Sequence, residues 1–122
     1  MDKKKVLIID DEQDLLQIMN ERLRASGYEV ATATDGVSAI STALREKPDL
    51  ILLDIGLPAG DGFTVIRRVK SLAPISLTPI IVITALDALA NKERALEAGA
   101  KAFLQKPIDT DELLCAIEKA LQ

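Results

Sequence analysis

The sequence predicts an α/β domain in which five short parallel strands form one sheet with helices on both of its faces. Strand-like apolar runs alternate along the whole chain with segments whose apolar residues recur at helical spacing. The runs are continuous, as in strands covered on both faces, and the strand–helix–strand order favours parallel pairing. We expect residues 1–122 to form one domain, because this length suits one hydrophobic core and not two.

The predicted strands differ in how deeply they should be buried. They are residues 6–9, 28–32, 50–53, 79–83 and 101–105. Residues 6–9 and 50–53 are wholly apolar, which is typical of central strands in a parallel sheet. Residues 28–32 are partly β-branched but mixed in polarity, which favours an edge position.

Each predicted helix has an apolar face that can pack on this sheet. The helices are residues 13–26, 36–46, 62–72 and 88–98, with a last helix from residue 110. Gly27 and Gly99 follow the first and fourth helices, where glycine commonly ends a helix. In the second helix, Val37, Ile40 and Leu44 fall on one face, which we expect to point inward.

Composition narrows the classes of function. Lys and Arg total 15 against 19 Asp and Glu, and the net charge of −4 argues against direct nucleic-acid binding. The first apolar run is too short for a signal peptide, and no run approaches the roughly 20 residues of a membrane span. Cys115, the one cysteine, cannot form an internal disulfide and is expected at the core or its boundary. We therefore expect a cytoplasmic protein that does not contact membranes.

Polar side chains follow four of the predicted strands at the point where each strand ends. Asp10 and Asp11 follow the first strand, Asp54 the third, Thr84 the fourth, and Lys106 the fifth. Ligands of doubly wound sheets bind beyond the carboxyl ends of the strands, so we expect these side chains to meet there. The sequence contains no histidine, so any metal must be held mainly by oxygen ligands.

The chemistry of this edge depends on its acids. A phosphate-binding loop would carry glycines, whereas Asp10-Asp11-Glu12 would repel a phosphate unless a cation lay between them. Carboxylates suit Mg²⁺, and Mn²⁺ would accept the same ligands. Asp54 is then the natural nucleophile, since a carboxylate can accept a phosphoryl group as an acyl phosphate. Glu12 is the least certain of the acids and is expected at most in the outer shell of the metal.

Other residues at this edge could hold the phosphoryl group in place. Lys106 offers a mobile positive charge and Thr84 a hydroxyl donor. Ala85 is small and would leave room for a phosphoryl oxygen at its backbone N–H. The carbonyl of Gly56 could turn towards the metal.

Taken together, these motifs make the chain resemble the receiver domains of two-component signalling, including the single-domain, chemotaxis-regulator type. The motifs are Asp10-Asp11, Asp54-Ile55-Gly56-Leu57-Pro58 with Asp61-Gly62, Thr84-Ala85 and Lys106-Pro107. The resemblance covers essentially all 122 residues. It implies a flavodoxin-like sheet with strand order 2-1-3-4-5 and a cis Lys106-Pro107 bond. Asp61-Gly62 is expected chiefly to turn the chain into the third helix.

The resemblance also implies roles for the site residues. Asp54 would be the phosphoacceptor, and Thr84 and Lys106 would bind the phosphoryl group. Asp11, Asp54 and the Gly56 carbonyl would ligate Mg²⁺, with Asp10 acting largely through water. The donor would be the phosphohistidine of a sensor histidine kinase or of a histidine phosphotransfer protein. The chain would not be a conventional enzyme, although it would catalyse its own phosphorylation and dephosphorylation.

Phe103 matches the switch aromatic of this family. There, the threonine moves towards the phosphoryl group and the ring turns into the space it leaves. The surface formed by the fourth helix, the fifth strand and the fifth helix would then change its affinity for a downstream protein effector. The same surface is a candidate for homodimer contact.

Three other functions compete with a receiver. A small Mg²⁺-dependent aspartyl-phosphate phosphatase or phosphotransferase usually has a second acid two residues after the nucleophile, where this chain has Gly56. An FMN-binding flavodoxin is disfavoured by the acidic first loop and by the small number of aromatic rings. A degenerate receiver that is never phosphorylated is disfavoured by the complete set of acids, threonine and lysine.

Overall fold

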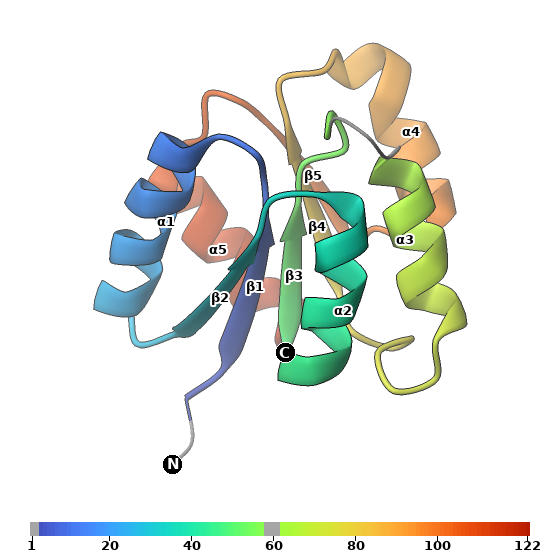
Figure 1. The fold of residues 1–122 in the computed structure, drawn as a ribbon. Helices are drawn as coiled ribbons and strands as arrows, with labels where there is room; N and C mark the ends of the chain where they lie inside the picture. The colour runs from blue at the N-terminus through green and yellow to red at the C-terminus, as the bar shows by residue number, and fades with distance from the viewer. Residues whose placement is uncertain (1–2, 58–61) are drawn as a thin grey trace.

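The computed structural model describes residues 3–57 and 62–122, and it contains the predicted parallel sheet with strand order β2-β1-β3-β4-β5 (Figure 1). The strands are β1 (Lys5–Ile9), β2 (Glu29–Ala33), β3 (Leu50–Leu53), β4 (Ile80–Thr84) and β5 (Ala102–Gln105). The helices are α1 (Gln13–Ala25), α2 (Gly36–Glu46), α3 (Gly62–Ser71), α4 (Ala88–Ala98) and α5 (Thr110–Ala120). The fold class, the strand order and the alternation of elements are confirmed. Pro58 and Asp61 lie outside the described residues.

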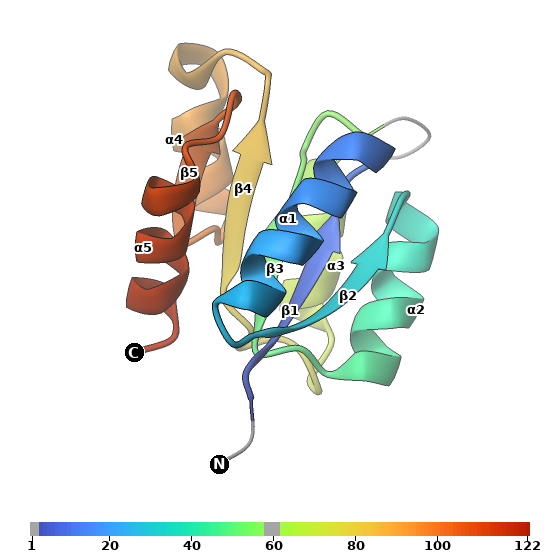
Figure 2. The ribbon, with the colours of Figure 1, turned by 90° about the vertical axis from the view of Figure 1, so that its left-hand side faces the viewer.

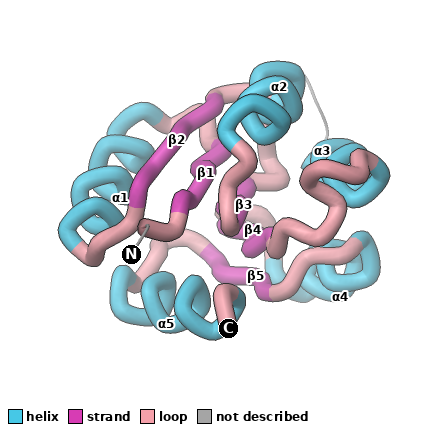
Figure 3. Tube along the Cα trace, turned by 90° about the horizontal axis from the view of Figure 1, so that it is seen from below, coloured by secondary structure: helices cyan, strands magenta, loops and turns pink. Residues whose placement is uncertain are grey.

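Helices cover both faces of the sheet and enclose two layers of core. Helices α1 and α5 lie on one face, and α2, α3 and α4 lie on the other (Figures 2 and 3). Leu16 and Leu23 of α1 pack with Ile117 of α5 in the first layer. Ile40 of α2 and Ile66 of α3 belong to the second layer. Successive strand residues point to opposite faces, so the continuous apolar strands supply both layers.

Burial along the strands follows their place in the sheet. Every residue of β3 and β4 is buried, as are the last four of β1, whereas β2 and β5 form the edges and are more exposed. The predicted edge position of the second strand is therefore confirmed. Phe103 lies on edge strand β5 and is only partly buried, packed against the core layer beneath α2, α3 and α4.

Two predictions about inward-facing residues are wrong. In α2, Ile40 is buried as predicted, but Val37 and Leu44 are 79% and 37% exposed, and Ala39 and Ala43 take the sheet-facing positions instead. The alanines, four residues apart, let the helix approach the sheet more closely than a larger pair would. Cys115 is exposed as well. The sheet-facing residues of α5 are Leu113 and Ile117, and Cys115 lies between them in sequence, away from that face.

Candidate functional site

The carboxyl edge of the sheet brings together the polar residues that the sequence singled out. Ile9 pairs with Leu53, so Asp10 and Asp54 follow side by side, and the N–H of Asp54 donates to the Ile9 carbonyl at 2.9 Å. Thr84 ends β4, and the N–H of Lys106 donates to the Thr84 carbonyl at 2.8 Å. The Lys106-Pro107 bond is cis, as the resemblance implied.

The ammonium group of Lys106 occupies the centre of the site. Its Nζ lies 2.8 Å from Glu12 Oε1, 2.9 Å from Asp10 Oδ2 and 3.1 Å from Asp54 Oδ2. Burial alone would lower the pKa of Lys106, since its side chain is only 10% exposed. The interactions with the three carboxylates outweigh burial and hold this pKa well above its ordinary value. Lys106 is therefore a permanent positive charge at this edge.

Asp10 is fully buried, and its neighbours compensate only part of the negative charge of its carboxylate. Its Oδ1 accepts a hydrogen bond from the N–H of Glu12 at 2.9 Å. Its Oδ2 is ion-paired with Lys106 but receives no well-directed hydrogen bond among the described residues. Burial raises the pKa of Asp10 above its ordinary value, although the Glu12 N–H and Lys106 counteract this. A buried carboxylate oxygen with spare capacity is a suitable ligand for a cation.

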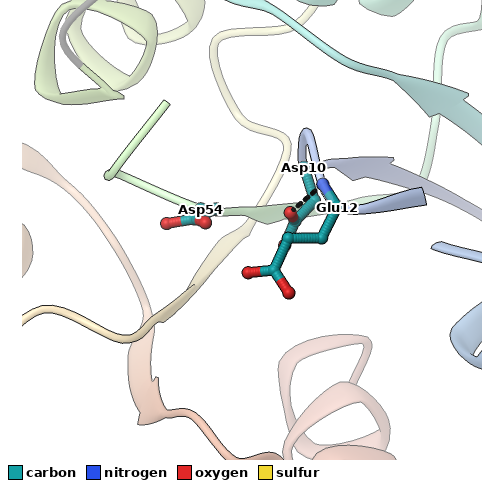
Figure 4. Close-up of side chains that lie close together, drawn as sticks. All are labelled: Asp10, Glu12 and Asp54. Atoms are coloured by element: carbon teal, nitrogen blue, oxygen red, sulfur yellow. Dashed lines mark hydrogen bonds between the residues drawn. The ribbon is translucent and has the colours of Figure 1, made fainter. Parts of the chain in front are cut away.

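Three acids at this edge lie close enough together to share a metal ion. Among the described residues, carboxylate oxygens of Asp10, Glu12 and Asp54 all lie within 4.8 Å of one another (Figure 4). Three carboxylates face one ammonium, so the cluster retains excess negative charge. Hard oxygen ligands with excess negative charge fit Mg²⁺. Asp11, a ligand by resemblance, is exposed and stands outside this group, while Glu12 lies inside it.

Asp54 is buried, and the backbone of Gly56 lies against one of its two carboxylate oxygens. Its Oδ1 accepts a hydrogen bond from the N–H of Gly56 at 2.8 Å, and its Oδ2 faces Lys106. A Cβ at Gly56 would lie 3.3 Å from Asp54 Oδ1 and 3.7 Å from the hydroxyl oxygen of Thr84. It would also lie 3.8 Å from Leu86 Cγ, so glycine at this position keeps a further side chain from crowding Asp54 and Thr84.

The residues expected to bind a phosphoryl group or to respond to it follow or belong to strands β4 and β5. Thr84 is buried, and its hydroxyl oxygen accepts a hydrogen bond from the N–H of Leu86 at 3.2 Å. Ala85 is exposed, so its small side chain leaves the edge open. Phe103 pairs with Val82 in the sheet, two positions before the pair formed by Thr84 and Gln105.

The importance of one residue and the existence of one contact are not evident from the sequence. Glu12 makes the shortest ion pair of Lys106, and its sequence position next to two aspartates was the only hint of this. Gly62 lies against Ile55, the residue after Asp54: a Cβ at Gly62 would be only 2.3 Å from the Ile55 Cα. This close approach packs the start of α3 against the segment that carries Asp54.

The fold and this edge together define the receiver class of signalling domains, and comparison with known families agrees. Residues 6–118 match the family described as the response regulator receiver domain. The chain therefore belongs to the receiver domains of two-component response regulators. Such domains interact with histidine kinases and downstream effectors. Nothing in the comparisons favours the phosphatase alternative.

Individual relatives support the same assignment. The chain is 42% identical over 117 residues to the response regulator PleD of Caulobacter vibrioides, covering 96% of this chain and 26% of PleD. It superposes on the chemotaxis response regulator CheY4 of Vibrio cholerae with a TM-score of 0.91 and 31% identity, covering 98% and 100% of the two chains. It spans about a quarter to a half of the curated relatives that it matches.

One similar structure contains a metal. The receiver domain of the sensor histidine kinase PA1611 from Pseudomonas aeruginosa has a magnesium ion coordinated in its active-site cleft. Its TM-score to this chain is 0.89 at 30% identity, covering 98% of both chains. Separately, no helix among the described residues of this chain is long and apolar enough to cross a membrane.

Proposed function

We propose that this chain accepts a phosphoryl group on Asp54 from the phosphohistidine of a histidine kinase or histidine phosphotransfer protein in the cytoplasm. The observation that carries the proposal is the position of Lys106, whose ammonium lies 2.9 Å from Asp10 and 3.1 Å from Asp54. This arrangement places a nucleophilic carboxylate, a buried acid and a permanent positive charge in contact at one edge of the sheet. Phosphoryl transfer needs mainly such positioning and charge neutralisation.

The transfer step follows from this geometry. A carboxylate oxygen of Asp54 attacks phosphorus, the O–P bond forms, the N–P bond breaks, and the imidazole leaves with the electron pair of that bond. Lys106 exchanges one of its carboxylate partners for a phosphoryl oxygen. The Thr84 hydroxyl and the Ala85 N–H donate to the other oxygens. These donors stabilise the charge that the phosphoryl group brings into the site.

Mg²⁺, with Mn²⁺ as a substitute, would be held by Asp10, Asp11, Asp54 and the carbonyl of Gly56. When bound, it supplies positive charge that neutralises the carboxylates and the phosphoryl oxygens. The resting structure supports part of this set, since Asp10 and Asp54 belong to the acidic cluster. The other acid of that cluster is Glu12 and not Asp11, so the contribution of Asp11 to metal binding needs its own test.

The output of the domain would be a change in the surface formed by α4, β5 and α5. Thr84 would move to the phosphoryl group and Phe103 would turn inward, which alters this surface for a protein effector or a second copy of the chain. The start of α4 already exposes apolar surface, with Leu89 96% exposed and Leu86 half-exposed next to the site. We propose no direct contact with nucleic acid or membrane.

The experiment is to incubate the protein with acetyl phosphate and Mg²⁺ and to measure its intact mass. We expect the mass of one added phosphoryl group, which hydroxylamine removes because it cleaves acyl phosphates. Asp54→Asn should abolish the addition, and Asp111→Asn, which changes an exposed aspartate on α5, should not. An addition that persists in Asp54→Asn would contradict the proposal. Turnover of many small phosphate esters would favour the phosphatase alternative instead.

A further inference from the structure

The side chain of Glu12 does not cap the helix at whose start it lies, but contacts a residue far away in the sequence. Glu12 is the N-cap residue of α1, yet its side chain accepts no capping hydrogen bond from the helix. It reaches instead to Lys106, 94 positions away, at 2.8 Å. The backbone of Glu12 also bonds to Asp10, which fixes where this side chain begins.

The three carboxylate partners of Lys106 differ in how easily each can give up its ion pair with the ammonium group. An ammonium has three N–H donors, and three carboxylates surround this one. The side chains of Asp10 and Asp54 are 0% and 8% exposed. Without the ion pair to Lys106, their negative charges would be left uncompensated inside the protein. The side chain of Glu12 is 58% exposed and can turn into water at little cost. Glu12 is therefore the partner that a phosphoryl oxygen can replace.

We propose that Glu12 is a positioning residue that holds Lys106 at the mouth of the resting site and yields its place to the incoming phosphoryl oxygen. Glu12 thereby slows the phosphorylation of Asp54 by small anionic donors, which meet a negative charge and an occupied ammonium at the entrance. This inference rests on the proposed function of Asp54. Glu12 forms no covalent bond, and Lys106 keeps its protons throughout.

The kinetic experiment compares variants at saturating Mg²⁺. The rate of mass gain is measured against acetyl phosphate concentration for the wild type, Glu12→Gln and Glu12→Asp. We expect Glu12→Gln to react about two- to fivefold faster, the size of effect that one partly exposed ion pair has. Glu12→Asp keeps the charge but shortens the side chain, so it should show at least half of the same gain. Asp14→Asn, an exposed acid in the first turn of α1, is the charge-matched control and should behave as wild type.

A second measurement does not depend on phosphorylation. The ¹³Cε and Nζ resonances of Lys106 are recorded in the free protein without Mg²⁺. They should move in Glu12→Gln and Glu12→Asp and stay in place in Asp14→Asn. Resonances that do not move in the Glu12 variants would overturn the contact.

The outcomes separate the inference from the proposed function. If the wild type gains a phosphoryl group on Asp54 but Glu12→Gln reacts at the wild-type rate, the positioning role is overturned while the proposed function stands. If only Glu12→Gln reacts faster and Glu12→Asp reacts at the wild-type rate, the negative charge of Glu12, and not its contact with Lys106, is the cause, and the positioning role is overturned. If no variant, including the wild type, is phosphorylated although the Lys106 resonances move, both the proposed function and the effect on rate are overturned.

Discussion

The Lys106 ammonium lies 3.1 Å from Oδ2 of Asp54, although the two residues are 52 positions apart and follow different strands. Strand β4 lies between β3 and β5, so the two side chains meet across an intervening strand whose own last residue is Thr84. A parallel sheet makes this meeting possible because all its strands end at the same edge.

Removing Lys106 should destabilise the protein. Lys106→Met leaves Asp10 and Asp54 buried near each other without their cation. We expect the free energy of unfolding in urea at neutral pH, without Mg²⁺, to fall by about 2–3 kcal/mol. Lys101→Met, which changes an exposed lysine just before β5, should have little effect. Equal stability of the two variants would show that Lys106 does not compensate the buried acids.

Magnesium should stabilise the folded protein and reveal which acids bind it. At a Mg²⁺ concentration tenfold above its dissociation constant, the gain should be about 1.4 kcal/mol, measured by urea unfolding at constant ionic strength. Asp10→Asn should remove most of the gain. If Asp11 is a ligand, Asp11→Asn should reduce the gain more than Glu12→Gln does. The reverse order would assign that ligand position to Glu12.

Gly62 should tolerate no side chain. The Cβ of Gly62→Ala would lie 2.3 Å from the Ile55 Cα and 2.9 Å from its carbonyl carbon, both backbone atoms that cannot move aside easily. We expect a loss of about 1–3 kcal/mol in the free energy of unfolding. Gly36→Ala is the matched control, since Gly36 also begins a helix but its Cβ would meet only a side-chain methyl of Val65 at 3.3 Å. Similar losses in both variants would mean that helix-start glycines, and not the Ile55 contact, explain the effect.

The switch role of Phe103 can be followed with fluorine. The chain has two phenylalanines, so protein labelled with 4-fluorophenylalanine should give one ¹⁹F line for Phe63 and one for Phe103. Adding beryllofluoride and Mg²⁺ should move the Phe103 line, because the proposed switch turns the ring when Thr84 moves. Thr84→Ala should suppress that movement. A Phe103 line that stays fixed in the wild type, under conditions where beryllofluoride is bound, would rule out the switch.

The N-cap of α2 should contribute a pH-dependent part of the stability. The Asp35 side chain accepts a hydrogen bond from the N–H of Ser38 at 2.8 Å, which lowers the pKa of Asp35 below its ordinary value of 3.8. A lowered carboxyl pKa gives stability that is fully present above 3.8 and is lost as the pH falls through the folded-state pKa.

Asp35→Asn keeps a capping side chain that does not titrate, so it isolates this term. The difference in urea midpoint between wild type and Asp35→Asn should be constant above about pH 5. Below the ordinary carboxyl pKa, the midpoint of the wild type should fall relative to that of the variant. A difference that stays constant down to about pH 3 would show that the Asp35 bond is absent in solution.

Sequence pattern was a reliable guide where one physical signal decided the outcome. Continuous apolar runs can be buried on both faces only in the interior of a parallel sheet, so residues 6–9 and 50–53 had to be central. The pattern was a poor guide where two helix faces were both apolar. In α2, the choice between a face with Val37 and a face with Ala39 depended on how closely the helix could pack on the sheet.

By itself, the sequence determined the class of fold and the composition of its polar edge, because local periodicity fixes the elements and parallel strands must end together. It also predicted that Asp10, Asp54, Thr84 and Lys106 belong to that edge. Only the tertiary structure decided the contacts among them. It placed Glu12 on Lys106 and left Asp11 outside the cluster, because side chains that follow one strand diverge in direction. Which of two adjacent acids turns towards a lysine 94 positions away depends on the packing of the whole sheet.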